Sequence, residues 1–176
     1  MDQRFIMTAF GQDRPGIVAD VTRLLYENGC NLEETTMTQL ADEFTLILLF
    51  TSRDGAIEDI LGRECRRLER ERGISAFLRP LQQRRAAAGP AAEAWVLHVE
   101  GEDQAGIVYK VSQYLADQGV NIVDLSSTVQ PAPGSGSPFY VMDIHVQVPA
   151  GIAGTALETG LAAVADELHV DISMRR

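Results

Sequence analysis

The chain has 176 residues, of which 45% are hydrophobic and 23% charged, a composition typical of a folded globular protein and not of a disordered tail. Its formal net charge of −10 disfavours direct binding to nucleic acid, since phosphate contacts need a positive surface. No apolar run approaches the ~20 residues that span a bilayer, and the first ten residues lack the basic and apolar regions of a signal peptide, so we expect a cytoplasmic protein.

The first predicted elements are a buried strand and an amphipathic helix. Residues 4–10, RFIMTAF, fit a buried strand. In the helix that follows, Asp13 is expected near the N-cap, Pro15 in the first turn, and Gly29 at the end. Its apolar positions recur at helical spacing: Ile17, Val18, Val21, Leu24 and Leu25.

A hairpin, a second helix and a last strand complete this half of the chain. Residues 30–40 and 43–52 read as two strands around the turn LADE, because EFTLILLFTS is too rich in β-forming residues for a surface helix. The second helix has the apolar stripe Ile57, Ile60, Leu61, Cys65 and Leu68. Gly73 then introduces the strand 74–81. The predicted order is βαββαβ.

The same order repeats in the second half. Strands are predicted at residues 94–100, 120–130, 139–148 and 169–175, and helices at 105–118 and 152–167. Between the halves, QQRRAAAGPAAE has the composition of a flexible linker. We therefore predict a first domain at residues 1–82, a linker at 83–92 and a second domain at 93–176.

Two copies of βαββαβ predict an α+β protein with two ferredoxin-like domains, each a four-stranded antiparallel sheet with two helices on one face. The other face of each sheet differs between the copies. In the second copy, strand parity turns Val141, Asp143, His145 and Gln147 outward, a face that tolerates water. In the first copy the outward positions include Ile47 and Leu49, so we expect this face to meet another sheet, in the same chain or in a homo-oligomer.

One turn is written twice. GQDRPGIVADV at residues 11–21 and GEDQAGIVYKV at 101–111 place Asp, Gly, Ile and Val in the same order, displaced by 90 residues. Backbone N–H groups at the start of a helix can accept a carboxylate, and Asp13 or Asp103 can hold an ammonium group. Asn31 and Asn121, in GCNL and GVNI, add an amide that both donates and accepts. Such a combination suits the two charged ends of an α-amino acid.

A mechanical interpretation competes with the binding one. Aspartate caps helices, glycine allows tight packing of helix on sheet, and asparagine favours the turn into a strand. Each residue alone fits this interpretation better. Their joint recurrence in two copies supports binding in at least one pocket.

On these residues, the pattern GxxDxPGIVxxV…GxNI on a βαββαβ frame resembles the ACT domain, a regulatory module that commonly binds amino acids at interfaces between domains. The resemblance covers nearly the whole chain. Two such domains with nothing else, together with the longer loop QPAPGSGSPFYVMDIHVQVPA, are similar to the glycine cleavage system transcriptional repressor family. The resemblance implies a bacterial, cytoplasmic repressor that acts through a partner transcription factor, without a DNA-binding motif or cofactor of its own, and it points to glycine as the ligand.

The resemblance also implies the ligand-binding residues. The first copy would use Gly11, Asp13, Pro15, Gly16 and Asn31. The second would use Gly101, Asp103, Gly106 and Asn121. The second copy departs from the pattern at Gln104 and Ala105, which we expect to loosen its turn, so the first copy is the stronger candidate.

Other candidate sites have weaker patterns. Arginines in GRECRRLERER could dock an acidic partner, but they alternate with acids as on many solvated helices. His98, His145 and Asp143 share the outward parity, although their spacing is not diagnostic of a metal site. The cysteines Cys30 and Cys65 lack zinc or disulfide spacing.

Catalytic motifs are not evident in the sequence, which lacks a phosphate loop, a nucleophile elbow and a metal-ligand helix motif, so we expect no enzyme activity. The first copy also resembles the N-terminal regulatory domain of formyltetrahydrofolate deformylases, but a second copy stands where a formyl-transfer domain is expected. Two hypotheses follow. One is an amino-acid sensor with a pocket within one chain or between chains; the other is a constitutive protein-interaction module whose pockets are remnants.

Overall fold

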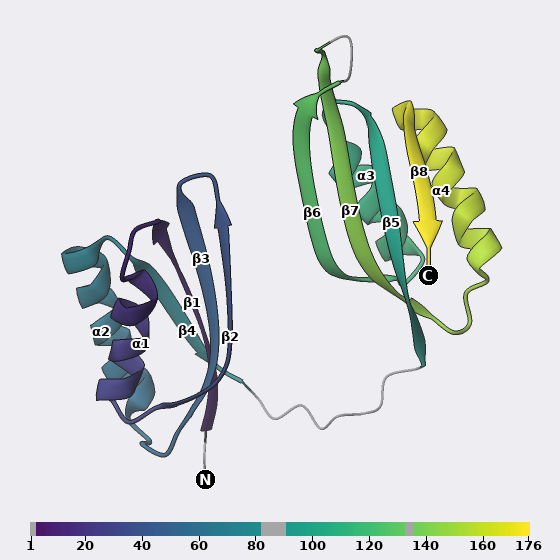
Figure 1. The fold of residues 1–176 in the computed structure, drawn as a ribbon. Helices are drawn as coiled ribbons and strands as arrows, with labels where there is room; N and C mark the ends of the chain where they lie inside the picture. The colour runs from purple at the N-terminus through teal and green to yellow at the C-terminus, as the bar shows by residue number, and fades with distance from the viewer. Residues whose placement is uncertain (1–2, 82–90, 133–135) are drawn as a thin grey trace. The chain divides into compact units, whose positions relative to one another are not determined.

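The computed structural model describes residues 3–81, 91–132 and 136–176 (Figure 1). The chain divides into two compact units, Met1–Arg85 and Ala86–Arg176. The predicted linker, residues 83–92, lies mostly outside the described residues, although its last position, Ala92, begins a strand. The domain boundaries therefore stay a prediction.

The first unit has the predicted βαββαβ order. Its elements are β1 (Gln3–Gln12), α1 (Ile17–Glu27), β2 (Asn31–Leu40), β3 (Glu43–Ser52), α2 (Ile57–Arg72) and β4 (Ser75–Pro80). The strands form an antiparallel sheet in the order β2-β3-β1-β4, and both helices cover one face of it (Figure 1). Strand β2 is therefore an edge strand.

The second unit repeats this arrangement. Its elements are β5 (Ala92–Glu102), α3 (Ile107–Asp117), β6 (Asn121–Pro131), β7 (Pro138–Pro149), α4 (Gly154–Leu168) and β8 (Val170–Arg175). The sheet order is β6-β7-β5-β8, again antiparallel. The predicted fold class, two ferredoxin-like domains, is confirmed. Three residues of the loop between β6 and β7, 133–135, lie outside the described residues.

Each unit has its own core between the helices and one face of the sheet. In the first, Met7, Leu46 and Leu48 are fully buried beneath the apolar sides of α1 and α2. In the second, the alternate residues of β7 are buried, as predicted: Tyr140, Met142, Ile144, Val146 and Val148. Trp95 belongs to this core, and its indole Nε1 donates to Glu93 at 3.2 Å. Strand alternation therefore placed the core faces correctly.

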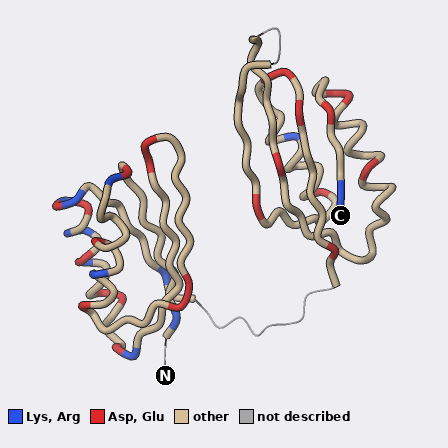
Figure 2. Tube along the Cα trace, viewed as in Figure 1, with Lys and Arg blue, Asp and Glu red and all other residues tan. Residues whose placement is uncertain are grey.

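The faces of the two sheets that the helices leave uncovered differ in character. On the first sheet Ile47 and Phe77 are exposed, and Phe10 stacks on Phe77 with ring centroids 6.0 Å apart. On the second sheet His98 and Asp143 face outward and contact one another. Figure 2 shows acidic residues predominating in the second unit, where Lys and Arg number three and Asp and Glu eleven over residues 86–176.

In the described ranges, no helix is both long and apolar enough to cross a bilayer.

Candidate functional site

The repeated turn of the first unit joins β1 to α1. Helix α1 begins after Gly16, which is its N-cap and has a φ of 93°. The predicted N-cap role of Asp13 is wrong, because within the described residues no side chain caps this helix, and Pro15 precedes the N-cap and lies outside the helix. Asp13 instead anchors the turn to the β2–β3 hairpin: its N–H donates to the Asp42 carbonyl at 2.8 Å.

Glycine is required at Gly16 by the backbone and not by crowding. A Cβ at this position would come no nearer than 4.0 Å to a neighbouring atom, so the prediction of tight helix–sheet packing at this glycine is wrong. Its left-handed φ is the reason, because L-residues other than Asn and Asp rarely adopt it. Gly106, with a φ of 100° and open space around it, has the same role in the second unit.

Two other glycines of the motif are the ones in close contact. A Cβ on Gly11 would lie 2.8 Å from the Gly73 carbonyl oxygen, where β1 passes the end of α2. A Cβ on Gly101 would lie 2.7 Å from Val170 Cγ1. Gly11 and Gly101 therefore have a packing role that is sufficient to explain them without a ligand.

Charged and polar side chains hold the first turn. Asp13 Oδ2 accepts a hydrogen bond from Gln39 Nε2 at 2.7 Å, and the Asp13 side chain is half-buried. Arg14 Nη2 donates to Asp20 Oδ2 at 2.8 Å, linking the turn to the first turn of the helix. This hydrogen bond to Arg14 is the main reason that the pKa of Asp20 lies below its ordinary value. The carboxylate of Asp13 thus remains at the surface next to the N-terminus of α1.

The second turn is held differently. Gln104 Nε2 donates to the carbonyl of Leu168 at the end of α4, and Lys110, which stands where the first copy has Asp20, pairs with Glu167. The expected loosening at Gln104 and Ala105 is not seen, since the backbone of Gly106 matches that of Gly16. The exposed Asp103 donates its N–H to the Pro138 carbonyl at 3.3 Å.

The predicted asparagines lie away from the turns of their own units. Asn31 pairs with Thr51 at one end of β3, whereas Asp13 bonds to Asp42 just before the other end. Along a ten-residue strand this separates them by roughly 30 Å. Asn121 pairs with Gln147 in the same way, far from Asp103. The structure therefore does not bring the predicted site together within one unit.

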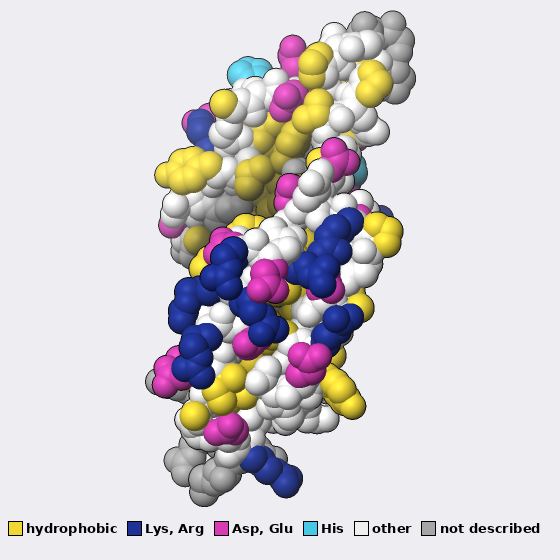
Figure 3. Space-filling model, turned by 90° about the vertical axis from the view of Figure 1, so that its left-hand side faces the viewer, with side chains coloured by type: hydrophobic (Ala, Val, Ile, Leu, Met, Phe, Trp, Pro, Cys, Tyr) yellow, Lys and Arg dark blue, Asp and Glu magenta, His cyan; other side chains and the backbone are white. Residues whose placement is uncertain are grey.

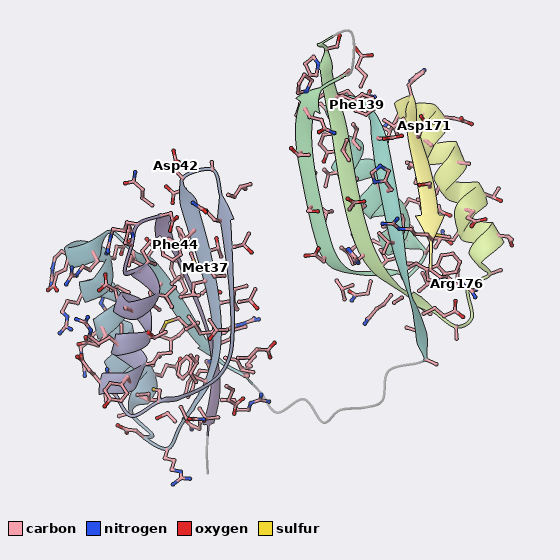
Figure 4. All side chains as sticks on the ribbon, in the orientation of Figure 1. Met37, Asp42, Phe44, Phe139, Asp171 and Arg176 are labelled. Atoms are coloured by element: carbon pink, nitrogen blue, oxygen red, sulfur yellow. The ribbon has the colours of Figure 1, made fainter. Side chains whose placement is uncertain are left out.

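Asn31 lines a surface cleft that the sequence did not predict. The cleft has a volume of about 510 Å³ and lies between α1 and the start of β2, with Thr22, Tyr26 and Leu32 in its wall. Tyr26 is 83% exposed. Along the same strand, Met37 is also exposed and Asp42 lies at the tip of the hairpin, near the turn (Figure 4). The Asn31 amide and the β1–α1 turn therefore lie at opposite ends of the exposed edge strand β2.

Chemically, the two ends complement one another. The turn offers a carboxylate and uncapped helical N–H groups, which suit an ammonium and a carboxylate respectively. The Asn31 end offers an amide beside apolar walls. Gln39, which orients Asp13, was missed by the sequence analysis; the hairpin register, in which Gln39 lies opposite Phe44 near the turn, was the signal that could have found it.

Three other candidates remain: the outward histidines, the cysteines and the arginines of α2. His98 contacts Asp143 at 2.8 Å, but residues 3–81, 91–132 and 136–176 contain no group of His, Cys, Asp and Glu that could hold a metal ion. Burial raises the pKa of Cys65 to about 11, which leaves an unreactive thiol. The α2 arginines gather on the helical face of the first unit (Figure 3), where Arg67 pairs with Glu64 at 2.8 Å and Glu71 at 3.9 Å.

Comparison with known proteins finds a family model that matches the first unit and relatives that match nearly the whole chain. Residues 3–75 match the family model of the ACT domain. The chain is 28% identical over 175 residues to the glycine cleavage system transcriptional repressor of Escherichia coli strain K12. The aligned part covers 96% of this chain and 87% of that protein, so the likeness includes both units.

Two solved structures share the architecture. The crystal structure of an unknown protein from Galdieria sulphuraria is 30% identical, with a TM-score of 0.80, and the match covers 99% of this chain and 98% of that one. A second, described provisionally as a glycine cleavage system transcriptional repressor, is 23% identical with a TM-score of 0.72 over 99% of this chain and 97% of the other. This second likeness shows the fold alone.

Proposed function

We propose that this chain, a tandem ACT-domain protein resembling the glycine cleavage system transcriptional repressor, is a regulatory protein that responds to a small amino acid and has no catalytic role of its own. It would act on transcription, as the name of its relative states. We propose further that this action takes place in the cytoplasm and through a partner protein. The observation that carries the proposal is the likeness to the repressor over 96% of the chain.

The acidity of the protein supports an indirect action on transcription. A formal net charge of −10 gives little attraction for DNA phosphates. The second unit, at −8 over residues 86–176, is the more acidic. A protein partner that itself contacts DNA would remove the need for a basic surface here.

We place the amino acid at the edge of the first sheet, between two copies of the chain. Strand β2 is an exposed edge, and edge strands are templates for pairing with another strand. If β2 pairs antiparallel with β2 of a second copy, the Asn31 end of one strand lies beside the Asp42 end of the other. Asn31 would then approach the turn of the partner, with its Asp13 and Gly16, which it cannot reach in its own unit.

Thermal unfolding with a panel of amino acids, glycine and serine included, tests the proposal. Ligand at about 100 times its dissociation constant stabilises the folded state by about 2.7 kcal/mol, a shift of several degrees in the melting temperature. We expect a selective shift in the wild type that is lost in Asp13→Ala and in Asn31→Ala. Gln39→Ala, which removes the same Asp13 hydrogen bond but keeps the carboxylate, is the matched control and should retain most of the shift.

Absence of a shift with every amino acid would contradict the sensor and favour a constitutive interaction module. Ile47 and Phe77 are exposed on the outer face of the first sheet. An exposed apolar face can bind another protein without any small ligand, which favours this second candidate.

A further inference from the structure

The outer face of the first sheet, defined here as the surface opposite α1 and α2, has a regular pattern across its four strands. One row, read from β4 to β2 by backbone register, is Arg79, Ile6, Leu49 and Glu34. This row is basic at one edge, apolar in the middle and acidic at the other edge. Within the described part of the chain, no ion pair or hydrogen bond engages the Arg79 or Glu34 side chain.

The next two rows combine bulky and small side chains. The second row is Phe77, Thr8, Ile47 and Thr36, and the third is Ser75, Phe10, Thr45 and Thr38. Phe77 is 65% exposed, and Phe10 and Ile47 are exposed to 43% and 41%. These rows contain no charge, and each pairs apolar side chains with threonine or serine.

We propose that the outer face of the first sheet packs against the same face of a second copy of this chain, about a two-fold axis that runs along the strands between β1 and β3. Such an axis reverses each row, so β4 of one copy lies over β2 of the other. Arg79 then faces the partner's Glu34, and Ile6 faces the partner's Leu49.

In the two uncharged rows, the same reversal places each bulky side chain over a small one. Phe77 lies over the partner's Thr36, Ile47 over its Thr8 and Phe10 over its Thr45. Bulky side chains therefore meet small ones on both sides, which is how the layers of a packed core interdigitate. The aligned packing of two twisted sheets, with strands crossing at about 30°, is compatible with an axis along the strands.

The face is large enough for a stable contact. Four strands at ~4.8 Å spacing and ten residues at ~3.3 Å rise give roughly 600 Å² on each copy. The total for two copies is about 1,200 Å², the lower end of specific interfaces. Burial of exposed phenyl and aliphatic groups is what such an interface needs at its centre.

The corresponding face of the second unit is a poorer partner. Its central strand places His98 and Glu100 outward, and Asp143 lies beside them on β7. Asp171 lies opposite Glu100 on β8. Covering these groups with an apolar surface would remove water from three carboxylates, which costs free energy unless each is paired. The outer face of the first sheet should therefore bind the same face of a second copy in preference to the outer face of the second unit.

Phe77→Lys in the full-length chain tests the interface by light scattering or sedimentation. Phe77 is exposed, so the substitution leaves the core intact, and a lysine over the partner's Thr36 should reduce the particle mass to half the wild-type value. Ser173→Lys is the matched control, since Ser173 lies opposite His98 as Phe77 lies opposite Thr8. An unchanged mass in Phe77→Lys would overturn the proposal, and a halved mass in Ser173→Lys would identify the second unit as the occupant instead.

A charge exchange tests the axis itself. Within one sheet Arg79 and Glu34 are three strands apart, about 14 Å, and cannot pair. Arg79→Glu and Glu34→Arg should each raise the dissociation constant about tenfold, because each creates two like-charged pairs across the axis. The double variant should recover the wild-type constant. Failure of the double variant to recover it would exclude this axis.

Self-association through the outer face is independent of the proposed amino-acid response, and separate measurements test the two. The outer face and the β2 edge are different surfaces. Phe77→Lys should therefore keep any thermal shift with amino acid while it loses half its mass, and Asp13→Ala should keep its mass while it loses the shift.

Discussion

At the scale of single residues, Gly16 and Gly11 belong to one motif but are selected by different physics. Gly16 is needed because its φ of 93° is strained for a side chain, although space around it is open. Gly11 is needed because a Cβ would collide with the Gly73 carbonyl, although its backbone is ordinary. The letter G alone does not distinguish these causes, so the general expectation that glycine allows tight packing holds at Gly11 and fails at Gly16.

Substitutions at Gly16 distinguish backbone strain from side-chain crowding as the reason that glycine is needed there. We expect Gly16→Ala to lower the free energy of unfolding by about 1–2 kcal/mol, the cost of a left-handed conformation for an L-residue. Gly16→Asn should cost less, because asparagine tolerates this region. Urea denaturation of both variants measures the difference. Equal losses in the two would point to contact of the side chain instead of backbone strain.

A pH effect is expected at His98. Its Nδ1 lies 2.8 Å from Asp143 and its Nε2 3.5 Å from Glu100, and the hydrogen bond to Asp143 is the main cause that raises the pKa of His98 above 6.5. Because the folded pKa is the higher one, this stabilisation is fully present below pH 6.5 and is lost as the pH rises through the folded pKa.

NMR titration of the histidine ring protons measures this effect. Asp143→Asn should move the pKa of His98 back toward 6.5. Asp124→Asn, which changes the residue opposite His145, serves as the control and should leave His98 unchanged. A titration midpoint of His98 that does not respond to Asp143→Asn would refute the assignment.

At the scale of elements, periodicity predicted the strands and helices, and the failures lie at their ends. Alternation in 139–148 and the apolar stripe of α2 were correct because burial imposes them directly. The start of α1 was wrong because aspartate favours an N-cap in general, whereas here Gly16 caps the helix. Asn31 and Asp13 lie at opposite ends of β3, and the sequence alone left open whether a pocket lies within one chain or between chains.

The α3–α4 contact depends on one small residue. A Cβ on Gly160 would lie 1.9 Å from the hydroxyl oxygen of Tyr114, which donates to the Leu157 carbonyl at 3.3 Å. We expect Gly160→Ala to lower the free energy of unfolding by about 1–3 kcal/mol through overpacking. Gly62→Ala in α2, where a Cβ meets open space, should instead raise it by about 0.5–1 kcal/mol.

Chemical denaturation of Gly160→Ala and Gly62→Ala should give changes in the free energy of unfolding that have opposite signs, if contact with the added Cβ is the cause. The Tyr114→Leu/Gly160→Ala double variant should recover part of the loss, since the first copy has Leu24 at the position of Tyr114. Stabilisation by Gly160→Ala alone would show that Tyr114 moves aside without cost.

At the scale of the whole molecule, one duplicated fold has acquired two surfaces. Both units keep the order βαββαβ, the positive-φ glycine before the first helix and a bulge early in the edge strand. They differ on the sheet face that the helices leave uncovered, whose side chains the fold does not constrain. This face is apolar in the first unit and charged in the second. Duplication therefore predicts the fold of each half well and the contacts of each half poorly.

The separation of Asn31 from the turn has a genetic consequence. If the amino acid binds between two copies as proposed, a chain with Asp13→Ala and a chain with Asn31→Ala would each lose amino-acid binding alone, since every shared site in either population contains one defect. Coexpressed in equal amounts, they form mixed dimers in which one of the two sites combines an intact Asp13 with an intact Asn31. About a quarter of the wild-type binding capacity should return, whereas two defects within the same half of the site would never complement.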